Sequence, residues 1–594
     1  MSEKLNNPLN ELLLSLNERQ KEAVLSDERN ILVVAGPGTG KTRVLISRVS
    51  YLLNRLKESK DNSLIVSITF TNQASIEIKN RIKAIGLNDA NIFSGTFHQF
   101  ALWMLSNRDF YDLELIDEGD SRRLYLKAAK LLGIHNNDAR KFYRLRQRKD
   151  INDSRLCCLE LKYKELLYES LFWDFDTLLY DFLRFLKICS KRGKIKPFIS
   201  HLLVDEFQDV NHIQYEIIKT LSKLGANTFL IGDPNQAIYG FRGANPKFLA
   251  NLAHDFSQLK EISLDISYRC SQKILDASAS VVSAKRLRSF LNKKGDVFLL
   301  HFKDEDSEAR WITKKIEEIA GSLSIDAIDR GLGTFSEPIS LSEIAVLYRV
   351  NQMANAISSE LSKAGIPWYR SDKPSALAHP HIRWIHKLWQ ATGSNNPEFF
   401  LEELPGGVKR WRDKLKDIKD KIINKNGRDI IRILIKELNL DIDSPVLSVL
   451  VAMSDQINTA SDMALCLRNA QDVLGISFEG VRLLSLHAAK GLEFSVVFII
   501  GLEQGILPLF DADIDEEKRL FYVGITRAKE KLFLSYCDKR NIWVKKNNPY
   551  INLKKSPFID LIQTDLLQDI KPYNKSKKKK KKKIKPKASQ KSLF

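Results

Sequence analysis

The sequence has few cysteines and no long uncharged apolar run. None of its six cysteines has CxxC spacing with another: they are Cys157, Cys158, Cys189, Cys270, Cys466 and Cys537. This argues against a zinc ribbon, an iron–sulfur cluster or a disulfide scaffold and predicts reduced, buried thiols. No stretch approaches the roughly 18 apolar residues of a membrane-spanning helix, and the N-terminal leucine cluster is too short for a signal peptide. We therefore expect a cytoplasmic protein without a membrane partner.

Acidic residues are too few to balance the basic ones. Lys and Arg exceed Asp and Glu by 20, and 12 lysines without any acid fall within residues 571–594. A basic surface favours polyanionic partners through counterion release, although charge alone names no specific one. The seven consecutive lysines at 577–583 repel one another, which predicts a disordered tail. The 594 residues are enough for roughly four domains.

Short apolar runs alternate with helical patterns along most of the chain. The runs lie at residues 31–35, 64–68, 202–204, 228–231, 344–348, 496–500 and 531–535. Runs bounded by Gly, Asp or Pro are typical of buried strands in parallel sheets. They fall into two groups, which predicts two α/β domains. Residues of purely helical pattern, at about 104–195 and 371–480, interrupt the groups and predict two insertions.

The first run leads into a glycine-rich loop. Residues 31–42 read ILVVAGPGTGKT, and a helical pattern follows. The predicted loop comprises Ala35, Gly36, Pro37, Gly38, Thr39, Gly40, Lys41 and Thr42. Glycines let backbone N–H groups surround phosphates at a helix N-terminus. Lys41 is placed to reach the β- and γ-phosphates, and the Thr42 hydroxyl to bind Mg²⁺.

A second strand supplies acidic groups for the metal. Residues 202–209 read LLVDEFQD, so two adjacent carboxylates follow a buried apolar run. Asp205 ends the run and suits Mg²⁺ binding, while Glu206 suits activation of the attacking water. The sequence therefore predicts a Mg²⁺-dependent hydrolase of a nucleoside triphosphate.

These two motifs together resemble superfamily 1 DNA helicases of the UvrD/Rep/PcrA type. Further segments resemble that family's motifs in its order: LNERQ at 16–20, ITFTN at 68–72, GTFH at 95–98, GDPNQAIYGFRGA at 232–244, SYR at 267–269, VRLLSLHAAKGLEF at 481–494 and EKRLFYVGITRA at 517–528. The resemblance extends over about residues 12–560. It implies two RecA-like parallel-sheet motor domains, each with a mainly helical inserted subdomain.

The resemblance implies roles for residues outside the phosphate loop. Around ATP, it places Gln20 and Tyr268 on adenine, Glu493 on ribose and Arg43 near the nucleotide. Gln236 would sense the γ-phosphate, and Arg269 and Arg527 would act on it as arginine fingers. On DNA, aromatic rings suit stacking on bases of any sequence. The implied DNA contacts are Phe70, Asn72, Thr96, His98, Tyr239, Phe241, Arg242 and His487; the family often has Trp at position 241.

The predicted domains follow from the motifs and the interruptions. Residues 1–103 and 196–270 form the first motor domain, with residues 104–195 as its insertion. Residues 271–370 and 481–570 form the second, with residues 371–480 as a shortened insertion. Residues 571–594 form the lysine-rich tail, which suits DNA or a partner. The tail ends Gln590-Lys-Ser-Leu593-Phe594, which resembles a bacterial sliding-clamp-binding peptide except that Lys591 replaces the usual leucine.

The primary prediction is an ATP-dependent 3′→5′ DNA helicase and single-stranded DNA translocase in DNA repair, replication or recombination. Its partners would be single-stranded DNA and junctions with duplex, and its location cytoplasmic and nucleoid-associated. One alternative is a clamp-tethered translocase that displaces proteins from single strands with little unwinding. Another is a phosphate-loop ATPase unrelated to nucleic acid, whose ATPase rate would not change when single-stranded DNA is added.

Overall fold

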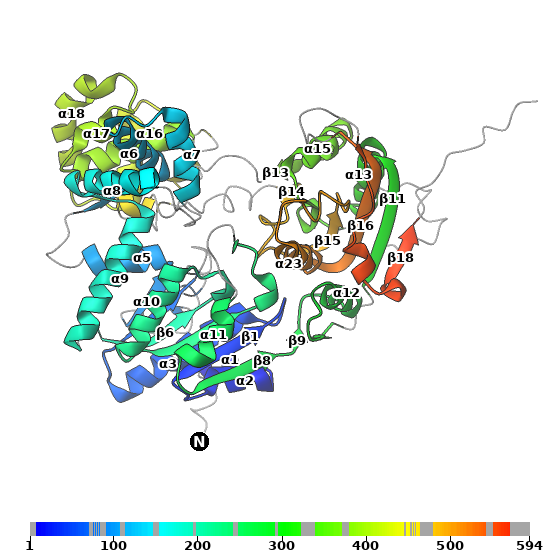
Figure 1. The fold of residues 1–594 in the computed structure, drawn as a ribbon. Coiled ribbons are helices and arrows are strands. Elements are labelled where there is room, and N and C mark those ends of the chain that lie inside the picture. The colour runs from blue at the N-terminus through cyan, green and yellow to red at the C-terminus, as the bar shows by residue number, and fades with distance from the viewer. Residues whose placement is uncertain are drawn as a thin grey trace, which may run out of the picture.

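The protein is described from a computed structural model. The structure describes residues 8–69, 91–106, 113–146, 154–193, 198–240, 247–291, 295–321, 339–370, 379–442, 479–541 and 551–570, with isolated residues between 75 and 83 and between 444 and 463. Two large sheets, two short two-stranded sheets and the helices around them make up these ranges (Figure 1). No helix among them is both long and apolar enough to cross a membrane.

The first α/β domain is built on a six-stranded parallel sheet with the order β3-β2-β6-β7-β1-β8. The strands are β1 (Asn30–Ala35), β2 (Leu64–Ile68), β3 (Ile92–Gly95), β6 (Ile199–Val204), β7 (Asn227–Gly232) and β8 (Leu259–Leu264). Successive residues of β1 point to opposite faces, as a strand requires. Ile31 and Val33 pack under α2 (Glu18–Leu25) and α3 (Lys41–Ser59). Leu32 joins the core on the other face, with α5 (Phe97–Ser106), α9 (Phe175–Arg192), α10 (His212–Lys223) and α11 (Lys247–Asp255).

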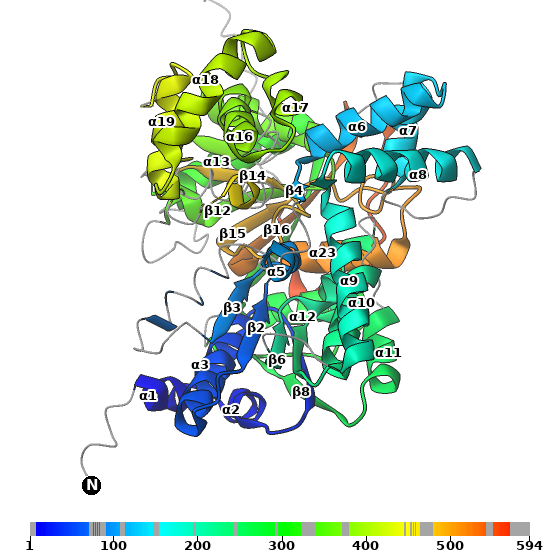
Figure 2. The ribbon, with the colours of Figure 1, turned by 90° about the vertical axis from the view of Figure 1, so that its left-hand side faces the viewer.

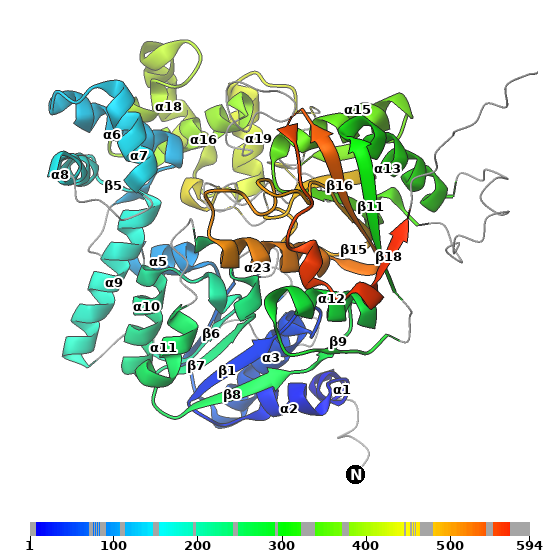
Figure 3. The ribbon, with the colours of Figure 1, turned by 45° about the vertical axis from the view of Figure 1, so that its right-hand side comes forward.

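The second α/β domain has a longer sheet with the order β13-β14-β12-β15-β16-β11-β18, and its strands are parallel along this order. Figure 3 shows β15, β16, β11 and β18 of this sheet. The strands are β11 (Asp296–Asp304), β12 (Ile344–Tyr348), β13 (Trp368–Arg370), β14 (Val481–Ser485), β15 (Phe494–Ile499), β16 (Ala528–Arg540) and β18 (Leu567–Ile570), while β17 (Ile551–Asn552) pairs antiparallel with β16. One face carries α12 (Gln272–Val282) and α23 (Ile514–Ile525), and the other carries α13 (Glu305–Ile319) and α15 (Ala354–Lys363).

All seven predicted apolar runs are strands, which confirms the two parallel-sheet domains. The prediction missed strands that lie at or near sheet edges, such as β8, whose sequence is LKEISL, and β11, whose sequence is DVFLLHFKD. Such strands are buried on fewer sides and carry charged residues, so an apolar-run criterion does not detect them.

The predicted insertions are mainly helical. The first contains α6 (Glu118–Leu131), α7 (Asn136–Arg146) and α8 (Ser154–Glu169), with a short parallel pair, β4 (Glu114–Leu115) and β5 (Phe172–Trp173). The predicted range 104–195 also includes α9, which packs on the first sheet. The second contains α16 (Pro380–Gly393), α17 (Pro397–Leu401), α18 (Gly407–Ile422) and α19 (Gly427–Glu437). Figure 2 shows the two groups side by side, and their buried apolar residues form one continuous core.

Candidate nucleotide and DNA site

The glycine-rich loop joins the end of β1 at Ala35 to the start of α3 at Lys41. Gly38 and Gly40 have φ angles of +70° and +85°, a left-handed conformation that favours glycine. A Cβ atom on Gly38 would lie 2.4 Å from the Cβ of Arg269, and one on Gly40 would lie 2.8 Å from Nε2 of Gln20. The close packing therefore requires glycine, and the helix N-terminus behind the loop favours an anion.

The acidic pair follows β6, which lies in the same parallel sheet as β1. The carboxyl ends of both strands therefore reach the same sheet edge. Asp205 is buried, and Glu206 has a left-handed backbone with φ +46°. The Glu206 N–H donates to Oδ1 of Asp205 at 2.9 Å. Nζ of Lys41 lies 3.4 Å from Oε1 of Glu206, so loop and acidic pair are in direct contact.

The two carboxylates differ in how readily they ionise. Burial and the neighbouring Glu206 raise the pKa of Asp205 to about 7. Burial also opposes ionisation of Glu206, but Lys41 and Lys490 hold its pKa below the ordinary value. A divalent cation beside Asp205 would remove its penalty for carrying a charge in a buried site. The donors fit Mg²⁺, which uses one or two protein carboxylates together with phosphates.

Thr42 and Arg43 follow Lys41 on the first turn of α3, Thr42 half-buried and Arg43 exposed. Gln20 is buried behind the loop, and its Nε2 donates to the Thr39 carbonyl at 3.0 Å. The Tyr268 N–H donates to the Gly38 carbonyl at 2.8 Å. The predicted adenine contacts thus lie beside the loop, reached from α2 and from the connection between the α/β domains.

The predicted arginine fingers are brought near one another, and each has protein partners. Nε of Arg269 donates to Oε2 of Glu493 at 2.6 Å, so the predicted ribose residue pairs with a predicted finger. Arg527 is buried and donates to the carbonyls of Val523 and Leu492 at 2.9 and 3.0 Å. Burial and the nearby Arg269 lower its pKa to about 10.

A relay of hydrogen bonds joins Glu206 to the predicted γ-phosphate sensor. The Gln208 amide donates to Glu206, and its Oε1 accepts from the Asp233 N–H at 2.9 Å. The Asp233 carboxylate accepts from Nε2 of Gln236 at 2.7 Å. Gln208 thus connects the residues that follow β6 to those that follow β7. Gln208 and Asp233 lie inside motifs identified from the sequence, but their mutual contact was not predicted.

Lys490 of the second α/β domain completes this relay. Its Nζ lies 2.8 and 2.5 Å from the carboxylate oxygens of Asp209 and 2.7 Å from the Gln236 carbonyl. It also lies 5.0 Å from the centroid of the Tyr239 ring. Sequence reasoning missed Lys490 and Asp209, although both stand in quoted motifs, because 281 positions separate them.

The predicted DNA contacts that the structure describes lie on both domains. Thr96 and His98 lie where β3 ends and α5 begins, and Tyr239 follows the turn at 234–236. His487 lies in the turn after β14. Phe70, Asn72, Phe241, Arg242 and the tail with Gln590, Leu593 and Phe594 lie outside the described residues.

A phosphate loop and an acidic strand end, facing arginines from the domain connection and a second parallel α/β domain, define a two-domain P-loop nucleoside triphosphatase. Comparison with known families is more specific. Residues 16–257 match the UvrD/REP helicase N-terminal domain, and residues 262–383 and 421–539 match the UvrD-like helicase C-terminal domain. The chain belongs to the UvrD/Rep helicase family.

Curated relatives match over nearly the whole chain. The ATP-dependent DNA helicase Rep of Buchnera aphidicola subsp. Acyrthosiphon pisum is 31% identical, over 89% of this chain and 95% of the relative. DNA helicase II of Haemophilus influenzae is 27% identical, over 95% and 89%. The ATP-dependent DNA helicase PcrA of Bacillus subtilis is 25% identical, over 97% and 90%.

Proposed function

We propose that this protein, an ATP-dependent DNA helicase of the UvrD/Rep family, moves 3′→5′ along single-stranded DNA and separates duplex at junctions. Family membership supports the activity, and the direction is taken from the family resemblance. The observation that carries the mechanism is the relay from Glu206 through Gln236 to Lys490 and Tyr239. It joins the residues proposed for ATP hydrolysis to a residue proposed for DNA binding.

ATP binding would place its phosphates on residues 36–42. Lys41 then turns from Glu206 to the β- and γ-phosphates, since a triphosphate carries more negative charge than one carboxylate. Thr42 and Asp205 would hold Mg²⁺, which neutralises charge on the phosphate oxygens. Loss of the Lys41 contact raises the pKa of Glu206, and this makes Glu206 a better base toward the attacking water.

Domain closure would complete the site. Arg269 would leave Glu493 and bind the γ-phosphate, and Glu493 would then be free to bind the ribose. Arg527 would leave its two carbonyl partners and bind the γ-phosphate as well. Binding of the γ-phosphate by Gln236 would affect Lys490, because Lys490 donates a hydrogen bond to the Gln236 backbone carbonyl. Tyr268, Gln20 and Arg43 would hold the adenosine. Nucleotide state thereby changes the relative position of the two α/β domains.

DNA would lie across both domains, so their relative motion becomes stepping. Tyr239, Phe70 and Phe241 would stack on bases, which gives grip without sequence preference. Asn72, Thr96, His98, Arg242 and His487 would contact the backbone. Salt-dependent binding and a nucleoid-associated location follow from these contacts and from the basic charge of the chain.

The decisive experiment uses Glu206→Gln. Removing a general base lowers turnover by about 10²–10⁴-fold, while nucleotide binding is retained. Glu216→Gln on α10, a carboxylate outside the relay, is the control and keeps wild-type turnover. Unchanged turnover in Glu206→Gln would exclude Glu206 as the water activator. Unwinding of substrates with 3′ or 5′ overhangs tests the direction.

A second candidate function is a clamp-tethered translocase that displaces proteins from single strands. The terminal sequence QKSLF favours it. Deletion of residues 590–594 should then abolish binding to a bacterial sliding clamp and leave DNA-stimulated ATPase intact. Equal clamp affinity after deletion removes this candidate. Strand-separation and protein-displacement assays, run side by side, distinguish the two functions.

A further inference from the structure

Phe290 is an exposed aromatic residue that lies outside every motif identified from the sequence. Its side chain is 64% exposed. The centroid of its ring nevertheless lies 4.9 Å from that of the Tyr268 ring, and the two ring planes are tilted by 38°. Tyr268 is the residue proposed above to stack on adenine. Phe290 therefore covers one face of the Tyr268 ring and leaves the opposite face for a base.

The backbone fixes this arrangement of the two rings. The strand β9 (Ile266–Ser267) leads from β8 into α12, and β10 (Arg288–Ser289) follows α12 and pairs with it in parallel (Figure 3). Ser289 lies opposite Ser267, so the next residue of each strand, Phe290 and Tyr268, also lie side by side. The Phe290 N–H donates to the Ser267 carbonyl at 2.8 Å. The 4.9 Å between the rings is close to the roughly 4.8 Å spacing of neighbouring strands.

The same strand pair packs on the phosphate loop. The Ser267 hydroxyl donates to the Pro37 carbonyl at 2.9 Å. Leu287 lies against the loop so closely that a Cβ atom on Gly36 would be 2.6 Å from its Cδ1. The Tyr268 ring is therefore held at a set distance from the residues proposed to bind phosphates. A nucleotide needs this, because the ribose fixes the separation of its base from its phosphates.

Asn17 contacts the other end of the Tyr268 side chain. Its Nδ2 donates to the Tyr268 hydroxyl at 2.9 Å. Asn17 also caps α2, since its Oδ1 accepts from the Gln20 N–H at 2.9 Å and its own N–H donates to Oε1 of Gln20 at 3.1 Å. One residue thus contacts both side chains that were predicted to bind adenine. With Phe290 on its face and Asn17 at its hydroxyl, the Tyr268 ring is restrained at two points.

We propose that Phe290 and Asn17 are positioning residues for the nucleobase, which hold the Tyr268 ring in the orientation that stacks on adenine. The proposal rests on the adenine contact of Tyr268 in the proposed function. A side chain that is already ordered loses less rotamer freedom when a base binds, so the restraint raises affinity for the nucleotide. Neither residue belongs to the groups proposed for phosphate binding or hydrolysis. Their loss therefore weakens binding and leaves the chemical step intact.

Steady-state ATPase of the full chain with single-stranded DNA tests Phe290. Phe290→Ala should raise the KM for ATP about fivefold, as expected for the loss of one aromatic pair, and keep kcat. Phe290→Tyr, which retains a ring, should restore the wild-type KM. Phe198→Ala is the control, because Phe198 is another exposed phenylalanine of the first α/β domain, at 53%. A KM in Phe290→Ala equal to that of the control overturns the role of Phe290.

Inorganic triphosphate separates positioning of the base from damage to the phosphate loop. It has no base, so its inhibition constant against ATP should be the same in Phe290→Ala and in the wild type. An inhibition constant that rises as much as the KM for ATP would mean that Phe290 supports the loop itself, and this overturns the proposal.

Asn17→Ser tests the hydroxyl contact. Serine keeps an oxygen that caps α2, but it is too short to reach Tyr268. The KM for ATP should rise about threefold, as expected for one neutral hydrogen bond. Asn211→Ser on α10 is the matched control, because Asn211 and Gln214 form the same capping box away from the nucleotide. Equal KM values for the two serine variants overturn the role of Asn17.

Tyr268→Ala shows whether both residues act through Tyr268. It should raise the KM at least as much as Phe290→Ala, and adding Phe290→Ala to it should cause no further rise. Additive effects overturn the positioning role. A wild-type KM in Tyr268→Ala contradicts the proposed adenine contact and this proposal with it. A raised KM in Tyr268→Ala beside unchanged values in Phe290→Ala and Asn17→Ser overturns this proposal alone.

Discussion

The two interfaces that join the halves of this chain are built in opposite ways. Between the α/β domains, Ile238 of the first domain packs into the core of the second, and the polar contacts nearby include Lys490 with Asp209 and Nε of Arg519 with the Ala237 carbonyl at 2.8 Å. Between the insertions, a shared apolar core encloses a buried ion cluster. When an interface opens, exposed polar groups replace their protein partners with water. Charges buried in a dry core have no such replacement, so separating them costs more. Breaking the second interface therefore costs more than breaking the first.

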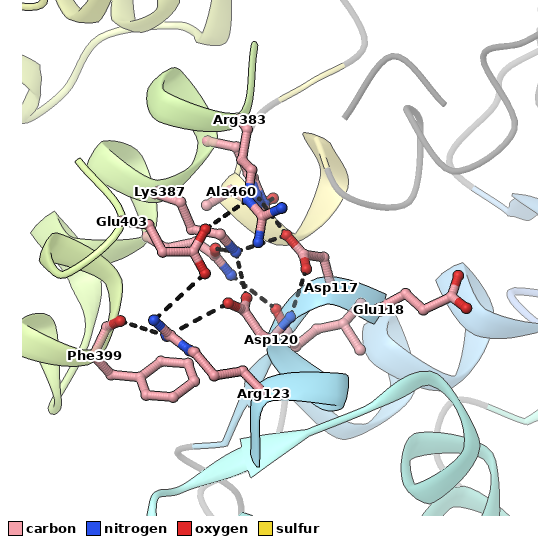
Figure 4. Close-up of polar contacts among 12 residues, drawn as sticks. Asp117, Glu118, Asp120, Arg123, Arg383, Lys387, Phe399, Glu403 and Ala460 are labelled. Carbon is pink, nitrogen blue, oxygen red and sulfur yellow. Dashed lines mark hydrogen bonds and ion pairs between the residues drawn. The ribbon is translucent and has the colours of Figure 1, made fainter. Parts of the chain in front are cut away.

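The largest expected effect breaks the insertion interface. Lys387 on α16 is buried and contacts Asp117 and Asp120 of the first insertion (Figure 4). Lys387→Met leaves both aspartates buried without a cation, which lowers the free energy of unfolding by about 3–5 kcal/mol. Denaturant titration followed by tryptophan fluorescence measures it, because Trp389 lies in the shared core. The variant with Lys387→Met, Asp117→Asn and Asp120→Leu removes every charge and should recover most of the loss. A loss of about 1.5 kcal/mol or less in the single variant would mean that this interface is no harder to break than the one between the α/β domains.

A smaller effect is expected at the domain interface. Lys490→Met removes a charged partner from Asp209, but opening of the interface lets water reach the carboxylate. We therefore expect a loss of about 1.5 kcal/mol, the lower end for hydrogen bonds to charged groups. The same variant should reduce stimulation of ATPase by single-stranded DNA more than basal ATPase, because it interrupts the relay to Tyr239. Equal reduction of both rates speaks against a coupling role for Lys490.

A pH experiment isolates the charge at the domain interface. Burial raises the pKa of Asp209 to about 6, although Lys490 opposes the shift. The folded chain thus binds this proton more tightly than the unfolded chain, so the contribution of Asp209 to stability grows as pH falls through 6 toward 4. Between pH 7 and pH 5 the gain is about 1 kcal/mol. Asp209→Asn should lack this gain, and identical pH profiles for variant and wild type contradict the assignment.

The smallest effect is expected at a contact on the solvent-accessible edge of the interface between the α/β domains. The Gly240 N–H donates to Oε1 of Glu516 at 3.2 Å in a solvent-accessible position. Glu516→Gln keeps an acceptor there, so the free energy of unfolding should change by less than about 0.5 kcal/mol. A change above about 2 kcal/mol in the same denaturant titration means that this rim contact is far more protected from water than its exposure indicates.

Local motifs account for the parts of the site that the sequence predicted. The glycine-rich loop and the acidic pair each occupy a few consecutive residues, and parallel strands bring their ends to one edge in any fold of this class. The partner of each arginine was not predictable in this way. Arg269 was expected at the γ-phosphate and pairs with Glu493, 224 positions away. Edge strands such as β8 were missed because their sequences mix apolar and charged residues.

The sequence alone determined the order of motifs, the two parallel sheets, the helical character of both insertions and the chemistry of the phosphate loop. These depend on residue type and on spacing within one element, which short-range physics controls. The tertiary structure decided which insertion packs on which domain, where Lys387 finds its aspartates and how Lys490 connects the two domains. Such pairings join side chains more than 250 positions apart. These pairings form where two distant surfaces pack together and exclude water, and no pattern within one element predicts which surfaces do so.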